Sequence, residues 1–310
     1  MAETLVISLG GNAFAAAGQE LSMAGQFAFA AKTLAPLAAP LLTENRFLVT
    51  HGNGPQVGYI LTRVEEALGK AYSLPLEVCV AESEGEIGYV LQQTLHNLTE
   101  GRRPVATLLT QVLVDAEDPA FAAPDKPVGP WFEPGQAQVL AQAGIPLVYD
   151  REGRGRRVVA SPAPHQIIEI EVIREMLALG VTVIAAGGGG IPVVERGGRL
   201  EGVEAVVDKD LATAMLAIGI DADQMVLVTG VPGIYENFDR PDARLLNRTY
   251  PGELQRMAGE GHFPLGSMGP KVAAVVQFVQ ATGRRAVVCQ PADLAAALAG
   301  EAGTVVEPVS

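Results

Sequence analysis

Two lysines in this chain occupy positions where a carboxylate is the usual choice. Lys209 lies between Asp208 and Asp210 in "VVDKDLATAML", where an apolar periodic pattern begins and a helix dipole favours negative charge. Lys271 repeats the pattern, since Pro270, at a predicted first helical position, precedes "KVAAVVQFV". Either Asp208 simply caps a helix and Lys209 is an exposed bystander, or both cations face a missing anion. A phosphate group would explain both, because helix N-termini and ammonium groups attract the same anionic oxygens.

Lysine is scarce in this sequence, so the positions where it occurs are candidates for a functional role. Of the 22 basic residues only five are lysines, and the others are arginines. A third notable lysine, Lys126, lies in a segment that contains proline and glycine, "PDKPVGP". The chain carries a net charge of −13, so an anionic ligand needs positive potential concentrated locally. We therefore expect Lys126, Lys209, Lys271 and backbone N–H groups to supply that potential.

Two glycine–asparagine loops follow two predicted strands. "SLGGNAF" places Gly10, Gly11 and Asn12 after the first strand, and "THGNGPQVG" places Gly52 and Asn53 after the second. Glycine lets the backbone approach an anion closely, and asparagine adds a side-chain donor. Each loop taken alone also fits a tight turn or the entry to a helix. Two such loops at neighbouring strand ends are typical of a shared pocket.

The usual motifs for other chemistries are missing from the sequence. The first loop is not G-x-G-x-x-G, and G-x-x-x-x-G-K-[ST] occurs nowhere, which argues against Rossmann and P-loop sites. The four histidines show no metal-ligand spacing, so we predict no protein metal site, and we interpret His51 as a structural hydrogen-bonding residue rather than a base. If the acceptor of a phosphoryl group were already an anion, no base would be needed, and catalysis would reduce to positioning and charge neutralisation.

Apolar strand patterns alternate with helical patterns along the chain. This alternation predicts an α/β fold with an open, mainly parallel sheet between helical layers, and ligands beyond the carboxyl ends of its strands. Residues 119–164 are rich in proline and glycine, which predicts an excursion from the main sheet, and a soft boundary falls near Gly180. The expected strands lie within 4–11, 45–54, 104–115, 145–150, 181–190, 223–231 and 285–290. The expected helices lie within 57–69, 87–98, 166–180, 211–219 and 272–283.

Composition narrows the function classes. The chain has 48% hydrophobic and 18% charged residues, as expected for a globular domain of this length. The acidic pI near 4.8 argues against nucleic acid as a partner. No apolar run reaches the length of a membrane span and "MAETLVISLGG" lacks a basic segment, so we expect a cytoplasmic protein without membrane contact. Cys79 and Cys289 are isolated in apolar surroundings, which predicts buried free thiols.

The motifs, in their order, resemble those of carbamate kinases within the amino-acid-kinase superfamily. The resemblance covers nearly the whole chain and rests on "SLGGNA", "THGNGPQVG", "IGYVLQQ", "TQVLVDAEDPAF", "KPVGP", "RRVVASPAP", "GGGGIPV", "GVEAVVDKDLA", "NFDRPD" and "GHFPLGSMGPKV".

The resemblance implies reversible, Mg²⁺-dependent phosphoryl transfer between ATP and carbamate, giving ADP and carbamoyl phosphate. It also implies one amino-acid-kinase-like domain over 1–310 and a homodimer. Residues 1–180 would form the acceptor lobe, with a small protruding subdomain at about 119–164, and residues 181–310 would form the nucleotide lobe.

Carried onto this sequence, the resemblance assigns roles residue by residue. Lys209 and Lys271 would neutralise phosphate charge, Asp210 would orient both, and Lys126 would reach in as a third cation. The transferred group would be held by Gly10, Gly11 and Asn12, with Gly52 and Asn53 beside the acceptor. The nucleotide would bind at Gly187, Gly188, Gly230, Tyr235, Met268 and Gly269.

The sequence departs from the family pattern at several positions. Where the family usually reads like "CGAMSQGMIGY", this chain has "CVAESEGEIGY", with Glu82, Glu84 and Glu86 in a segment expected near the active cleft. Gly230 replaces an aspartate in a "TDV"-like turn, and Gly155 and Ala160 replace a tryptophan and a proline. Two alternatives therefore stay open: another small-acid kinase of the same superfamily, or a non-catalytic nucleotide-binding regulatory relative.

Overall fold

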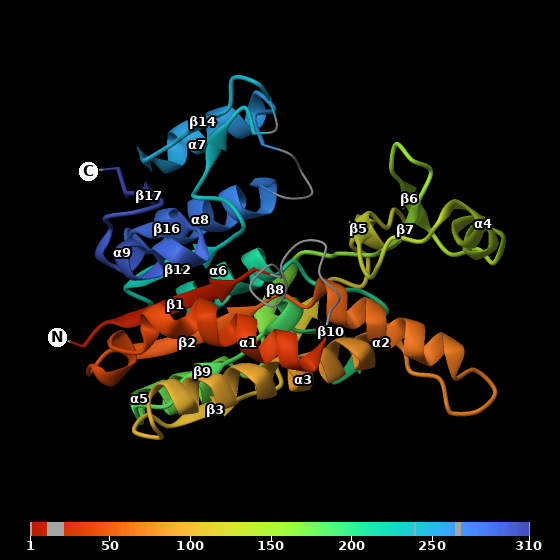
Figure 1. Ribbon diagram of the computed structural model, residues 1–310, viewed down its shortest axis with the longest axis horizontal. Coiled ribbons are helices and arrows are strands. Elements are labelled where there is room, and N and C mark those ends of the chain that lie inside the picture. Colours follow the sequence, from red (N-terminus) through yellow and green to blue (C-terminus); the bar gives the residue numbers. More distant parts are fainter. Residues whose placement is uncertain (1, 11–21, 239, 264–267, 310) are drawn as a thin grey trace.

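A mainly parallel sheet of eight strands forms the centre of the computed structural model, which describes residues 2–10, 22–238, 240–263 and 268–309. Every neighbouring pair in this sheet is parallel except β16 and β17, which confirms the predicted open α/β sheet (Figure 1). In spatial order the strands are β15 (Arg248–Thr249), β17 (Thr304–Val306), β16 (Ala286–Cys289), β12 (Gln224–Val228), β1 (Thr4–Leu9), β2 (Arg46–His51), β9 (Thr182–Ile184) and β3 (Val105–Thr107).

Helices cover both faces of the sheet because its central strands are apolar on both sides. In β1, Leu5, Ile7 and Leu9 point into one hydrophobic cluster and Val6 into the other, as the two-residue period of a strand requires. One cluster is closed by α1 (Met23–Leu34), α3 (Leu76–Leu98) and α9 (Leu294–Ala299). The other is closed by α5 (Ile170–Ala178), α6 (Lys209–Gly219) and α8 (Met268–Thr282), with α7 (Pro251–Gly259) packed on α8.

A second sheet lies beside the first, and its presence shows that the single strand expected at 104–115 was wrong. Its four strands are, in order, β11 (Arg199–Gly202), β10 (Ile191–Arg196), β4 (Gln111–Val114) and β8 (Pro164–Ile167). Residues 104–115, expected as one strand, therefore form two strands in two different sheets, β3 and β4. Strand β10 pairs in parallel with β4 and forms a hairpin with β11, which is exposed along its whole length.

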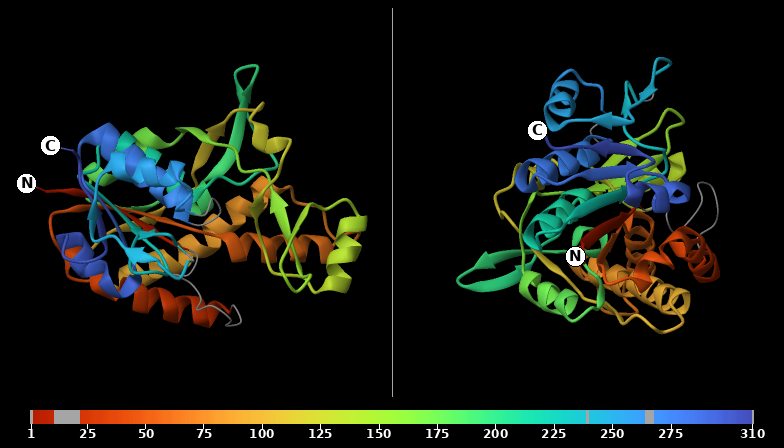
Figure 2. Two further views of the ribbon diagram at one scale, coloured as in Figure 1. Left: turned by 90° about the horizontal axis from the view of Figure 1, so that it is seen from above. Right: turned by 90° about the vertical axis from the view of Figure 1, so that its left-hand side faces the viewer.

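A small subdomain stands away from the main body (Figures 1 and 2). It contains α4 (Pro134–Gln142) and a three-stranded sheet of β5 (Lys126–Pro127), β7 (Gly155–Val159) and β6 (Leu147–Tyr149), all within the predicted excursion at 119–164. Residues 145–150, expected as a strand, therefore belong to this sheet. The subdomain rests on α2 (Gly54–Glu66), where Gly129 N donates to Gly54 O at 3.2 Å and Arg157 pairs with Glu65.

The main sheet runs without a break through the two predicted lobes. Strand β9 lies between β2 and β3, so it joins strands of the first half of the chain. The smaller elements are the pair β13 (Tyr235–Glu236) and β14 (Arg244–Leu245), and the 3₁₀ turns η2 (Ala35–Leu37), η3 (Pro40–Leu42), η4 (Pro119–Phe121), η5 (Gly187–Gly189) and η6 (Pro291–Asp293). Among the described helices, none has the length and apolar character to cross a membrane. Cys79 and Cys289 are buried free thiols, as expected.

Candidate active site

A cavity of about 450 Å³ opens where the carboxyl ends of β2 and β12 meet the N-termini of α6 and α8. This is the edge of a parallel sheet where ligands are expected. The residues that line it come from both halves of the chain and from the protruding subdomain. They include Gly52, Asn53, Pro55, Lys126, Gly188, Asp208, Lys209, Asp210, Thr229, Gly230, Phe238, Met268 and Lys271.

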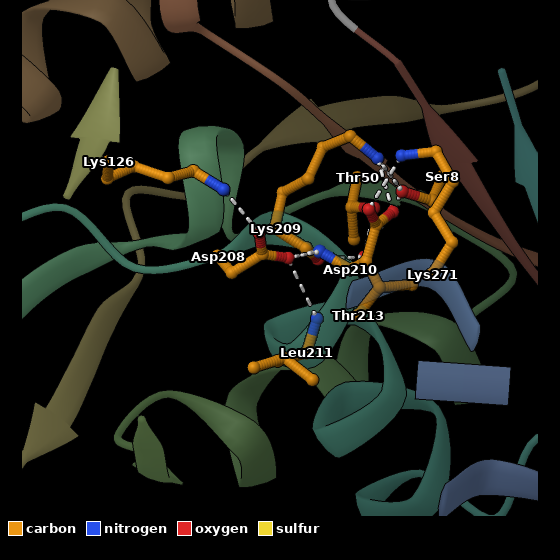
Figure 3. Close-up of polar contacts among 9 residues, drawn as sticks. All are labelled: Ser8, Thr50, Lys126, Asp208, Lys209, Asp210, Leu211, Thr213 and Lys271. Atoms are coloured by element: carbon orange, nitrogen blue, oxygen red, sulfur yellow. Dashed lines mark hydrogen bonds and ion pairs between the residues drawn. The ribbon is translucent and has the colours of Figure 1, made fainter. Parts of the chain in front are cut away.

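The two anomalous lysines share one buried carboxylate (Figure 3). Lys209 Nζ donates to Asp210 Oδ1 at 2.5 Å, and Lys271 Nζ donates to Asp210 Oδ2 at 2.9 Å. The side chains of the two lysines are 13% and 15% exposed, so Lys209 is not an exposed bystander. As predicted, Asp208 caps α6, since its Oδ1 accepts from Asp210 N at 2.8 Å. In α8 the expected start is wrong by two residues: Pro270 is its third residue and not its first.

The charges of this cluster do not balance. The pKa of Asp210 lies well below its usual range because, although burial opposes ionisation, two ammonium groups attract and hydrogen-bond the carboxylate. The same carboxylate raises the pKa of Lys271 against the effect of burial. Burial lowers the pKa of Lys209, and repulsion from Lys271 adds to it. Two cations therefore share one anion, and the cavity has an uncompensated positive charge for a ligand.

Three hydroxyl groups that were not predicted from the sequence form a chain of contacts that starts at Lys209 (Figure 3). Lys209 Nζ donates to Ser8 Oγ at 3.2 Å, Thr213 Oγ1 lies 3.3 Å from Ser8 Oγ, and Thr50 Oγ1 lies 2.7 Å from Thr213 Oγ1. Ser8 and Thr50 are cross-strand partners in β1 and β2. A signal existed in the sequence, because each is a polar residue near the carboxyl end of an apolar strand.

Lys126 reaches the site from β5 of the protruding subdomain. Its Nζ donates to Asp208 Oδ2 at 2.5 Å, while the other oxygen of Asp208 caps α6. Lys126 remains 30% exposed, twice as much as Lys209 or Lys271. One carboxylate thus connects the subdomain to the helix that carries Lys209.

The side of the cavity next to β2 is built from Asn53 and the glycine turn η5. Asn53 Nδ2 donates to Ser83 Oγ at 2.8 Å, and a Cβ at Gly188 would lie 2.1 Å from Asn53 Nδ2. A Cβ at Gly187 would lie 2.4 Å from the His51 ring. Gly188 also has a positive φ of 67°, so glycine is required there by both space and backbone. The sequence reasoning assigns Gly187 and Gly188 to the nucleotide, whereas the structure packs them against the loop expected at the acceptor.

His51 is buried behind this wall. Burial lowers its pKa to about 4, so the imidazole is neutral near pH 7. Its Nδ1 lies 3.3 Å from the carbonyl oxygen of Gly52. These features agree with a structural role and give no support for a base.

The remaining predicted site residues differ in position. Gly230 and Met268 line the cavity, whereas Gly10, Tyr235 and Gly269 are not among the described residues that line it. Gly10 N donates to Val228 O at 2.9 Å, which ties the end of β1 to β12. Tyr235 packs edge-on against Phe238, which lines the cavity in its place and which the sequence reasoning missed. Gly11 and Asn12 lie outside the described residues.

Three glutamates differ from the family pattern, and none of them is among the described residues that line the cavity: Glu82, Glu84 and Glu86. Glu82 is exposed, and Glu86 Oε1 accepts from Gln26 Nε2 at 3.1 Å. Glu84 is 1% exposed behind Gly187, and its Oε2 accepts from Thr110 N at 3.0 Å. Burial raises the pKa of Glu84 well above its usual range.

Carboxylates around the cavity are already engaged by protein groups. Both oxygens of Asp210 bind lysines, and Asp208 binds Lys126 and the N-terminus of α6. Within the described residues, no group of three His, Cys, Asp or Glu side chains could hold a metal ion.

Comparisons with known proteins agree on one group of relatives. The model of the Amino acid kinase family matches residues 3–290. The carbamate kinase of Pyrococcus horikoshii is 41% identical over 99% of this chain and 100% of its own length. A carbamate kinase-like protein of Escherichia coli is 43% identical over 99% of each chain. The structure of carbamate kinase from Giardia lamblia bound to AMP-PNP has a TM-score of 0.90 and 37% identity, covering 99% of this chain and 98% of that one.

Proposed function

This chain belongs to the amino acid kinase family and, within it, to the carbamate kinases, and from that membership we propose how its residues carry out the reaction. The chain is an ATP-dependent phosphotransferase that interconverts ATP and carbamate with ADP and carbamoyl phosphate. The single observation that supports the proposed mechanism most strongly is the pair of buried lysines held by Asp210 at the edge of the cavity.

In this mechanism Lys209 and Lys271 bind the phosphoryl group during its transfer. The transferred group spreads negative charge over its oxygens, so two preorganised cations in a buried site lower the energy of the transition state. Asp210 holds the ammonium groups in place before the substrate arrives, so little reorganisation is needed. Lys126 supplies a third positive charge from the protruding subdomain. Gly10, Gly11 and Asn12 remain the proposed backbone and amide ligands of the transferred group.

The two substrates approach from opposite sides of the lysines. We place the acceptor beside Gly52 and Asn53, and we now add Gly188 to that side because it packs against Asn53. The nucleotide lies toward Gly230, Met268 and Phe238, with Gly269 next to Met268 in the chain and Tyr235 packed against Phe238. Carbamate is already an anion, so no proton has to be removed before it attacks, in agreement with a neutral, buried His51.

We further propose that Mg²⁺ accompanies the nucleotide. Because Asp208 and Asp210 are engaged, the ion would be held by phosphate oxygens and water rather than by a protein carboxylate cluster. When bound, it supplies additional neutralisation of phosphate charge.

We also propose a homodimer in the cytoplasm. The family resemblance supports the dimer, and the two buried free thiols suit a reducing compartment. Sedimentation velocity would test the assembly, and a monomer at micromolar concentration would contradict it.

The decisive assay is ATP formation from ADP and carbamoyl phosphate in the presence of Mg²⁺. We expect efficient turnover, with acetyl phosphate markedly poorer because its methyl group cannot replace the amino group as a hydrogen-bond donor. Equal use of both acyl phosphates would favour another small-acid kinase of the superfamily. ADP binding without ATP formation from either compound would favour a regulatory relative.

A further inference from the structure

The hydroxyl group of Ser83 forms a relay of hydrogen bonds whose direction can be deduced. Ser83 is fully buried on α3, with its Oγ 2.6 Å from Val80 O and 2.8 Å from Asn53 Nδ2. Two oxygens at 2.6 Å repel unless a proton lies between them, and a carbonyl group can only accept. The Ser83 proton therefore points to Val80 O. Only lone pairs of Oγ remain for Asn53, so the Asn53 amide must present its NH₂ group to Ser83.

Because the NH₂ group of Asn53 is bound to Ser83, the Asn53 Oδ1 atom is left to accept a hydrogen bond from another group. Asn53 occupies the N-cap position of α2, where an asparagine oxygen normally accepts from the second or third backbone N–H of the helix. Here the side chain makes no capping hydrogen bond, and Pro55 removes one of the possible donors. The described residues offer no other hydrogen-bond donor to Asn53 Oδ1. An amide oxygen with a fixed orientation is thus present in the cavity wall, next to Gly188.

We propose that Ser83 is a positioning residue that turns Asn53 Oδ1 toward the acceptor, where it accepts a hydrogen bond from the amino group of the carbamoyl moiety. The inference rests on the proposed function, in which the acceptor binds beside Asn53. Acetyl phosphate carries a methyl group in place of that amino group and leaves the amide oxygen without a partner. A site built around one hydrogen bond rejects the analogue that lacks it, because the desolvated protein group is then unsatisfied.

The test compares two acyl phosphates as phosphoryl donors to ADP in Ser83→Ala. Without its partner the Asn53 amide loses its fixed orientation. We expect the ratio of kcat/KM for carbamoyl phosphate to that for acetyl phosphate to fall at least about tenfold, mainly through a higher KM for carbamoyl phosphate. Turnover of acetyl phosphate should change less than about threefold, because that substrate never used the hydrogen bond.

Thr94→Ala is the matched control. Thr94 is also buried on α3, and its Oγ1 donates to Val90 O at 2.7 Å, so the variant removes the same kind of hydrogen bond about 16 Å along the helix. Its selectivity ratio should equal that of the wild type. A double-mutant cycle with Asn53→Ala adds a second readout: if Ser83 acts through Asn53, Ser83→Ala should not change the ratio further in that background.

Each outcome is informative. A wild-type preference for carbamoyl phosphate that survives in Ser83→Ala overturns the positioning role and leaves the proposed function intact. If Ser83→Ala does not fold, Ser83→Cys replaces it, because a thiol is a weak acceptor and should lower the ratio partly; an unchanged ratio there also overturns the role. If the wild type forms no ATP from carbamoyl phosphate, the proposed function fails and the inference fails with it.

Discussion

Asp210 binds two ammonium groups at once, and this arrangement leaves the site with one positive charge to spare. In a buried position such an imbalance destabilises the free protein, because neither lysine has a full counter-ion. The charge is compensated when an anion enters the cavity. We therefore infer that Lys209 occupies the first turn of α6, against the preference of the helix dipole, because besides Asp210 it faces an anionic ligand in the cavity.

Removing either lysine should reduce catalysis strongly. We expect Lys209→Ala and Lys271→Ala each to lower kcat by at least about a hundredfold, the scale of one preorganised electrostatic contact. Arginine at either position should restore activity only in part, because a planar fork differs from a compact ammonium group. Lys70→Ala, at an exposed position, is the control and should retain wild-type turnover. Steady-state kinetics decide the matter, and near-normal turnover of both alanine variants would contradict the mechanism.

Glu84 should make stability depend on pH. Its folded pKa lies above the unfolded value of about 4.3, chiefly because of burial and also because of repulsion from Glu169. Its contribution to folding is therefore fully present below pH about 4 and is lost as pH rises through the folded pKa. In the variant Glu84→Gln the side chain still accepts a hydrogen bond from Thr110 N, but it cannot ionise. The melting temperature of Glu84→Gln relative to the wild type should rise as the pH increases above about 5, until the pH passes the folded pKa of Glu84.

Thermal unfolding across that pH range measures the effect. Glu82→Gln, an exposed change on the same helix, should show no such trend. A difference between Glu84→Gln and the wild type that is constant with pH would mean that Glu84 is not held protonated by burial.

The two lysines were predictable because each breaks a local rule for helix starts, whereas the role of Asp210 was implied only by the family resemblance. Ser8, Thr50 and Thr213 were missed for a physical reason. Their contacts depend on the register that places Ser8 opposite Thr50 and on the position of α6 above both strands. These are long-range properties, and a short window of residues does not contain them.

Helix α2 and the protruding subdomain meet through two glycines with no space between them. A Cβ at Gly58 would lie 1.8 Å from the Cα of Gly129, so the backbones are in direct contact. This contact, together with the Arg157–Glu65 ion pair, sets where β5 starts and thus where Lys126 points. The position of the subdomain is therefore determined by backbone packing on one side and by the Lys126–Asp208 pair on the other.

Gly58→Ala should disturb this junction, and Gly85→Ala should not. Gly58 lies inside α2, so its new methyl group must push the subdomain away, lowering both the melting temperature and kcat. Gly85 lies inside α3 with open space at its Cβ, and alanine there should stabilise the protein by up to about 1 kcal/mol. The two variants carry the same chemical change, so differential scanning calorimetry and kinetics isolate the contact. A fully stable and active Gly58→Ala would show that the junction is not tight.

Some strands could be predicted from the sequence, and others could not. The strands β1, β2, β9, β12 and β16 were predictable because their apolar runs are buried on both faces. The run 104–115 was misread as one strand. Both of its halves carry a strand pattern, but a pattern does not state which sheet a strand joins.

The molecule as a whole combines a main body, which holds the eight-stranded and the four-stranded sheets, with a subdomain that is attached at few points. We expect substrates to bind between the sheet and the subdomain, since Lys126 and Pro127 from the subdomain and Lys209 and Lys271 from the main body line the same cavity. A segment with few core contacts can move without disrupting the sheet. The sequence predicted this excursion from its composition, whereas its anchoring at Asp208 and Gly58 became visible only in three dimensions.

Closure of this subdomain should accompany substrate binding. In the free protein Lys126 pairs with Asp208. An anion bound between the lysines would attract Lys126 as a second partner, so the bound state should hold residues 119–164 more firmly. We expect amide hydrogen exchange there to slow when ADP and carbamoyl phosphate, or stable analogues of both, are present. The β10–β11 hairpin also projects from the body but contributes no residue to the described lining of the cavity, so its exchange serves as the internal control (Figure 2). Lys126→Ala should abolish the additional protection of 119–164 while leaving exchange of the free protein unchanged elsewhere. Equal protection of this segment with and without substrates would rule against closure.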